Sequence, residues 1–105
     1  DMSNWVEACA EGDIELEDLI GFKHGGQDYA VYRSPDDKYY ATAGHCTHEQ
    51  VLLDGGLVMD YIIECPKHNG RFDYRTGEAK GAPVCINLKS FPTKVEGGKV
   101  FIDLA

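Results

Sequence analysis

The sequence lacks the long features that mark membrane, fibrous or repeat proteins. No apolar run approaches the roughly 18 residues of a membrane-spanning helix. No segment keeps a helical period for three turns, and there are no internal repeats or low-complexity tracts. At 105 residues the chain is too short for two domains, so we expect one domain over residues 1–105. No signal-peptide pattern opens the chain, and Asp1 precedes Met2, so we expect Met2 to be the natural start and the protein to be cytoplasmic.

Basic residues are few, and cysteines are fewer still. Ten basic against 18 acidic residues give a net charge of −8, which is the wrong sign for a nucleic-acid-binding protein. The acidic surface fits two roles equally well, docking to a basic patch on a partner protein or maintenance of solubility. Four cysteines are too few for a disulfide scaffold, so some of them must serve another purpose.

Short runs rich in Val, Ile, Tyr and Phe alternate with turn residues, which is typical of strands. They predict strands at Asn4–Cys9, Asp18–Lys23, Tyr29–Arg33, Tyr39–Ala43, Tyr61–Glu64, Arg71–Tyr74, Ile86–Phe91, Lys94–Glu96 and Lys99–Asp103. Hairpin turns are expected at Gly97-Gly98, Gly26-Gln27 and Pro35-Asp36. Many short strands at close spacing indicate an all-β fold, an antiparallel sandwich or barrel.

Two segments interrupt this strand pattern, and both carry Cys and His. Gly44–Asp60 contains Cys46 and His48, and Cys65–Gly70 contains Cys65 and His68. The spacing is Cys-x-His, sixteen residues, then Cys-x-x-His. Two thiolates and two imidazoles select zinc or iron–sulfur. In most structural zinc sites each ligand-bearing segment supplies two ligands of one type, either two Cys or two His. Here each segment supplies one Cys and one His. Two loops that each give one Cys and one His can place like ligands side by side, as a Rieske centre requires.

At this point the sequence resembles the Rieske-type [2Fe–2S] ferredoxins of bacterial multicomponent, ring-hydroxylating oxygenase systems. The two loops match the family pattern in order, followed by Phe72-Asp73, Thr76-Gly77 and Gly81-x-Pro83. The resemblance implies that Cys46 and Cys65 bind one iron and that His48 and His68 bind the other, with one cluster per chain. It implies a Rieske-type antiparallel sandwich or barrel with two cluster-binding loops, and a covering segment that contains Pro83.

The resemblance also implies the function. We expect a monomeric one-electron carrier, not itself an enzyme, that links a reductase, flavin-dependent in type, to a terminal oxygenase, without binding nucleic acid or membrane. Two alternatives stay open: the small Rieske-type subunit of an assimilatory nitrite reductase, or a zinc-stabilised binding module.

Several positions depart from the high-potential respiratory members of the family. Val51 and Lys67 stand where those members have a disulfide, and Gly70 and Phe72 stand where they have hydroxyl donors. Fewer donors stabilise the reduced state less, which indicates the low-potential branch. A second proline is common four residues after the first, but here that residue is Asn87.

The remaining Cys, His and Trp side chains are predicted to have structural roles. Cys9 and Cys85 are expected to pack as small apolar residues, and Trp5 to anchor a core or an edge. We expect His24 to be exposed, and His45 to pack within its loop or to hydrogen-bond near the ligands.

Overall fold

The computed structural model describes residues 2–48, 50–67, 69–82 and 86–105. Its elements, in chain order, are β1 (Trp5–Ala10), β2 (Asp18–His24), β3 (Gln27–Arg33), β4 (Tyr39–Ala43), the 3-10 helix η1 (Leu53–Gly55), β5 (Leu57–Met59), β6 (Ile62–Glu64), β7 (Arg71–Asp73), β8 (Glu78–Ala79), β9 (Ser90–Phe91), β10 (Thr93–Glu96) and β11 (Lys99–Asp103). Within the described ranges nothing helical has the length and apolarity to span a bilayer.

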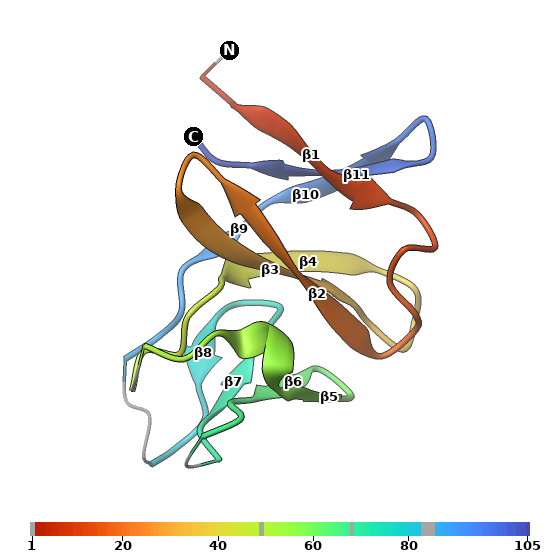
Figure 1. Cartoon of the computed structure of the whole chain (residues 1–105). Helices are drawn as coiled ribbons and strands as arrows, with labels where there is room; N and C mark the ends of the chain where they lie inside the picture. Colours follow the sequence, from red (N-terminus) through yellow and green to blue (C-terminus); the bar gives the residue numbers. More distant parts are fainter. Residues whose placement is uncertain (1, 49, 68, 83–85) are drawn as a thin grey trace.

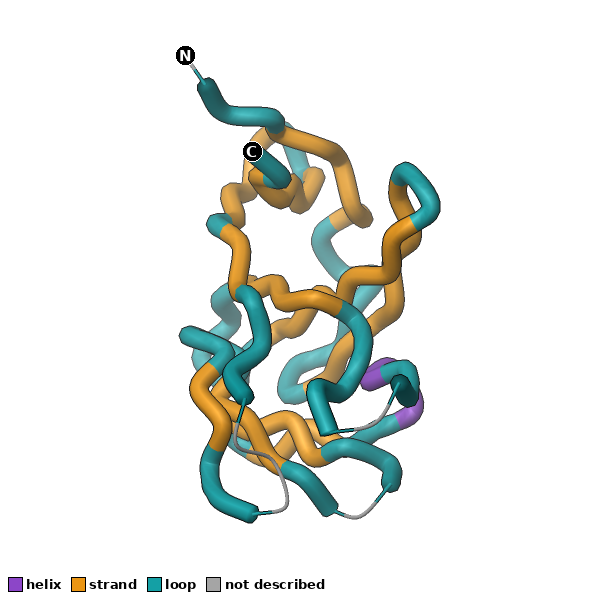
Figure 2. The backbone as a smooth tube through the Cα atoms, turned by 90° about the vertical axis from the view of Figure 1, so that its left-hand side faces the viewer, coloured by secondary structure: helices purple, strands orange, loops and turns teal. Residues whose placement is uncertain are grey.

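The strands form three antiparallel sheets, with orders β1-β11-β10, β2-β3-β4-β9 and β5-β6-β7-β8. Figure 1 shows them following one another from top to bottom, and Figure 2 shows that both termini lie at the end opposite the β5–β8 sheet. The predicted antiparallel all-β fold is confirmed.

Glycine pairs close two of the hairpins. Gly97 and Gly98 have φ of 58° and 79° and join β10 to β11, as predicted. Between β2 and β3 the positive φ angles fall on Gly25 and Gly26, and the ladder opens at His24↔Gln27. The predicted turn at Gly26-Gln27 is therefore one residue late, because both central residues of such a tight turn need positive φ.

The predicted strand Ile86–Phe91 is reduced to β9, Ser90–Phe91. Lys89 still accepts a hydrogen bond from Ala43 N–H of β4 at 2.9 Å, but Leu88 N–H donates to the Gly77 carbonyl, in the β7–β8 turn, at 2.8 Å, so the ladder does not continue through Leu88. Only Pro92 then separates β9 from β10, which pairs in a different sheet. Pro92 cannot donate to a ladder, and its carbonyl accepts from Asp103 N–H at 3.0 Å.

The sequence reading missed β5, β8 and η1. β5 lies inside the segment interpreted as an irregular loop, and it pairs with β6 across a turn at Asp60, whose φ is 53°. β8 has two residues and exists only as the partner of β7. Strands this short carry no periodicity, so pairing alone defines them.

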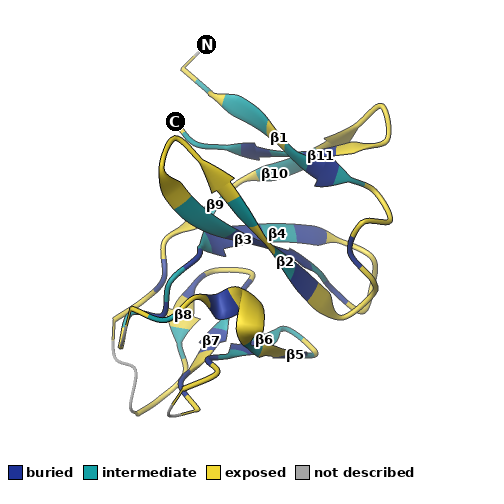
Figure 3. Ribbon diagram, in the orientation of Figure 1, coloured by how far each residue is buried: buried dark blue, intermediate teal, exposed yellow. Residues whose placement is uncertain are grey.

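Two apolar clusters lie between the three sheets, and β3 contributes to both. Figure 3 shows the burial of each strand along the ribbon. Val31 packs between the top and middle sheets, and Tyr32 packs between the middle and bottom sheets, because successive strand side chains point to opposite faces. Tyr32 stacks on Tyr74 with ring centroids 4.7 Å apart. The lower cluster therefore fixes the β5–β8 sheet and its loops to the rest of the chain.

Candidate metal centre

The first loop runs from Gly44 to Leu53 and folds back on itself. Leu53 N–H donates to the Gly44 carbonyl at 2.8 Å, and Cys46 N–H donates to the Val51 carbonyl at 2.9 Å. This closure turns Cys46 inward, where it is 1% exposed, and leaves His48 at the surface. The loop thus buries its thiol and exposes its imidazole.

The second loop, residues 65–70, follows β6 and leads into β7. It is closed in the same way, by Cys65 N–H donating to the Gly70 carbonyl at 2.6 Å. Cys65 is 2% exposed and belongs to the same lower apolar cluster as Cys46 and Phe72. His68, the fourth predicted ligand, lies outside the described residues.

The structure therefore brings together the two predicted Cys ligands and places His48 on the loop surface. Among the described residues, no three His, Cys, Asp or Glu side chains form a group that could hold a metal ion. The full four-residue ligand set stays a prediction. The donor chemistry fits a two-iron group, with soft thiolates in an apolar interior and an imidazole at the surface.

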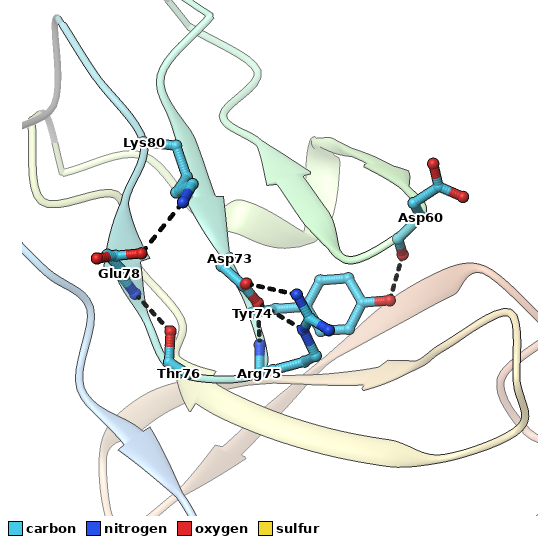
Figure 4. Close-up of polar contacts among 7 residues, drawn as sticks. All are labelled: Asp60, Asp73, Tyr74, Arg75, Thr76, Glu78 and Lys80. Carbon is cyan, nitrogen blue, oxygen red and sulfur yellow. Dashed lines mark hydrogen bonds and ion pairs between the residues drawn. The ribbon is translucent and has the colours of Figure 1, made fainter.

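The β7–β8 hairpin, which follows the second loop in the chain, is held by short polar contacts (Figure 4). Arg75 donates to the Asp73 carboxylate at 2.8 Å, and this hydrogen bond holds the pKa of Asp73 below its usual range. Lys80 lies 3.1 Å from Glu78, and the buried Tyr74 donates its hydroxyl to the Asp60 carbonyl. The hairpin is consequently anchored to the β5–β6 turn.

The covering segment is tied to both neighbours at its described end. Thr47, between the predicted ligands Cys46 and His48, donates its hydroxyl to the Ile86 carbonyl at 2.6 Å. Ala79 N–H of β8 donates to the Asn87 side-chain oxygen at 2.9 Å. Pro83, which the resemblance places in this segment, and Cys85, which is expected to pack as a small apolar residue, lie outside the described residues. Thr47 was not singled out from sequence, because its partner is 39 residues away.

Four other side chains can be compared with their predicted roles. Cys9 is buried in the upper apolar cluster, as predicted, and burial raises its pKa to about 11. His24 is exposed, as predicted, and also stacks on Phe22 at 6.1 Å. Trp5 is half-buried beneath the Lys94 ammonium, which lies 4.6 Å from its ring.

His45 contacts a residue that the sequence reading did not connect with the site. Its Nε2 lies 3.8 Å from Asp28 Oδ2, across from the start of β3. Asp28 and Asp54 both border the first loop, and no motif in the sequence marks either of them.

Charge is distributed unevenly between the two ends of the molecule. Residues 45–89 carry six acidic and five basic side chains, whereas the rest of the chain carries twelve and five. Within 45–89, acidic groups pair locally with basic ones, as Glu64 does with Arg71 at 3.0 Å. The end with the two loops is therefore almost neutral, and most of the −8 lies elsewhere.

Comparison with known proteins shows which cofactor the chain holds. Residues 4–92 match the family described as the Rieske [2Fe-2S] domain. The chain belongs to the Rieske [2Fe–2S] family. This membership assigns a [2Fe–2S] cluster to the chain and sets aside the zinc-stabilised module considered from sequence.

The proteins similar to this Rieske protein include ferredoxins that match it over nearly the whole length of both chains. It is 42% identical over 101 residues to the ferredoxin component of the naphthalene 1,2-dioxygenase system of Pseudomonas putida, with 96% of each chain covered. A chain of the solved complex of reduced oxygenase and oxidized ferredoxin in carbazole 1,9a-dioxygenase is 33% identical, with a TM-score of 0.88. The match covers 94% of this chain and 92% of that chain.

The nitrite reductase alternative receives weaker support from these comparisons. The putative NADH-dependent nitrite reductase small subunit of Mycobacterium tuberculosis superposes with a TM-score of 0.88, covering 100% of this chain and 98% of that one. Its sequence identity is only 19%, so the likeness establishes a shared fold and nothing more.

Proposed function

We propose that this Rieske protein carries single electrons from a reductase to a terminal oxygenase, with Cys46, His48, Cys65 and His68 as its cluster ligands. The observation that carries the proposal is the pair of buried cysteines, one from each loop, inside a chain that matches dioxygenase ferredoxins over nearly its full length. The chain is an electron-transfer component and not itself an oxygenase.

In this assignment Cys46 and Cys65 hold one iron, and His48 and His68 hold the other. A bound [2Fe–2S] cluster supplies reversible one-electron storage. The chain's own contribution is to bury both thiolates in the lower apolar cluster, away from water and oxidants. It also leaves the His48 imidazole at the surface, where a partner can approach it.

The partners follow from the same proposal. We expect a flavin-dependent reductase on one side and the oxygenase of a ring-hydroxylating system on the other, both in the cytoplasm. The chain works as a monomer, with residues 1–105 as one domain. The nearly neutral loop end then meets each partner in turn, while the acidic remainder of the molecule faces solvent.

The ligand assignment is tested by chemical analysis and electron paramagnetic resonance. The purified protein is expected to contain two irons and two acid-labile sulfides and to give a Rieske signal when reduced. His48→Ala and His68→Ala should each abolish that signal, because each removes half of the protein ligands of one iron. His24→Ala, at an exposed hairpin end far along the chain, is the matched control. An unchanged signal in either ligand variant refutes the assignment.

A further inference from the structure

A pocket of about 220 Å³ opens beside the first loop. Strands β2 and β3 form one wall, and the end of the first loop with η1 forms the other. Phe22, Tyr29 and Leu52 give it apolar surface, and Asp28 and Asp54 give it two carboxylates. The ligand assignment uses none of these five side chains.

The two ion-pair contacts of the Asp28 carboxylate are long. Its side chain is 23% exposed, with Lys23 Nζ 3.5 Å from Oδ1 and His45 Nε2 3.8 Å from Oδ2. The Lys23 side chain is itself 68% exposed, and such a surface ion pair adds little stability. Asp28 can therefore accept a better-placed cation.

Asp54 is exposed at the rim and sits directly against β2. A Cβ added at Gly21 would lie 2.6 Å from Asp54 Oδ2, so the missing side chain of Gly21 makes room for this carboxylate. No lysine or arginine in the described part of the chain pairs with Asp54. Lys23 also lines the pocket, but its ammonium is paired with Asp28, so the Asp54 carboxylate at the rim has no lysine or arginine beside it among the described residues.

We propose that this pocket receives an arginine side chain from the surface of a redox partner protein. A guanidinium carries several donors in one plane and can bond the two carboxylates together, while its stem packs on Leu52 and the aromatic walls. The pocket borders the first loop, so a seated arginine also sets the approach of the partner to His48. The inference rests on the proposed function for the nature of the partner, but not for the chemistry of the pocket.

The first test uses a small probe and needs no partner protein. N-acetyl-arginine-amide is titrated into the cluster-loaded protein, and the backbone amide shifts of Phe22, Lys23 and Tyr29 are followed by NMR. We expect saturable shifts that the uncharged N-acetyl-norleucine-amide does not produce. Asp54→Asn and Asp28→Asn should each weaken the binding about fivefold or more, because each removes one charged acceptor.

Three further variants separate the pocket from general charge effects. Lys23→Gln should strengthen binding, since it removes the cation that competes for Asp28. Gly21→Ala should weaken it with no change of charge, because the new methyl group displaces the Asp54 carboxylate. Glu11→Gln, an exposed acid in the β1–β2 loop, should leave it unchanged.

The same variants are then compared for binding to the purified oxygenase of the carbazole 1,9a-dioxygenase system. Absence of saturable shifts, or shifts that Asp28→Asn and Asp54→Asn leave unaltered, would overturn the inference whatever the oxygenase does. A purified protein without a reducible cluster would refute the proposed function. That result is independent of this inference, because the titration with N-acetyl-arginine-amide reports on the pocket alone.

Discussion

Phe72 packs in the same buried cluster as the two predicted cysteine ligands. It is fully buried in the lower apolar cluster with Cys46 and Cys65. The family resemblance places it where high-potential members are expected to have a hydroxyl donor. Phe72→Tyr is expected to raise the reduction potential, because a donor to a cluster sulfur stabilises the more negative reduced state. Protein-film voltammetry measures the shift. Phe101→Tyr, in the opposite sheet, should leave the potential unchanged, and an unchanged or lower value for Phe72→Tyr would contradict the expectation.

Cys9 is a buried thiol with no part in the metal site. Burial raises its pKa to about 11, so it stays protonated in the folded protein at pH 8.5, where an unfolded thiol is at most about half ionised. The stability that this protonated thiol contributes is present below the pKa of the unfolded thiol and is lost as pH rises toward 11. We expect iodoacetamide at pH 8.5 to label Cys9 slowly in native protein and quickly in urea, as peptide mass spectrometry can follow. Equal rates in both states would show that Cys9 is not protected.

At the scale of elements, the covering segment depends on two hydrogen bonds. Thr47 holds the Ile86 carbonyl, and Asn87 holds β8 through Ala79 N–H. Thr47→Val and Asn87→Ala should each speed loss of the cluster to a chelator severalfold, because the segment closes the site less firmly. Visible absorbance follows the loss. Thr93→Val breaks a similar hydroxyl–carbonyl bond to Tyr39 in the upper part of the fold and is the control. Identical decay in all three variants would mean that the segment does not guard the site.

The contact between the middle and bottom sheets centres on Tyr74. Its ring stacks on Tyr32, and its hydroxyl donates to the Asp60 carbonyl. Tyr74→Phe leaves that carbonyl without its donor and should cost about 1–2 kcal/mol of stability. For a domain of this size the thermal midpoint should fall by about 4–8 °C per kcal/mol, measured by circular dichroism. Tyr29→Phe serves as control, and an equal midpoint in both variants would show that the hydroxyl contributes nothing.

At the scale of the whole molecule, the uneven distribution of charge is the feature that affects encounter with partner proteins. The loop end carries nearly balanced charge, and the remainder carries most of the −8. A long-range acidic field speeds encounter with a basic partner, and salt screens it. We expect reduction by the cognate reductase to slow as ionic strength rises, in stopped-flow measurements. Lys67→Glu, in the exposed second loop, should slow it further without altering the visible spectrum, whereas Lys99→Glu in β11 should not. Salt-independent rates with a silent Lys67→Glu would mean that docking is mainly apolar.

The sequence by itself determined the features whose cause is local. Turn residues specified the hairpin at Gly97-Gly98, because only glycine adopts two successive positive φ angles at little cost. Alternating apolar residues located Tyr39–Ala43 and Lys99–Asp103 to the residue. The paired Cys-x-His and Cys-x-x-His loops indicated the Rieske family, since metal chemistry depends on residue type and spacing.

The tertiary structure alone decided the features that depend on pairing between distant segments. β5 and β8 are too short to show a periodic pattern. The first four residues of the predicted strand Ile86–Phe91 are not part of β9, because this stretch makes other contacts, such as that of Leu88 with Gly77. Asp28 and Asp54 are 26 positions apart in the chain and border one pocket because β2, β3 and the first loop pack together there. No local sequence pattern predicts that these two residues become neighbours, because contacts between distant segments depend on how the whole chain packs.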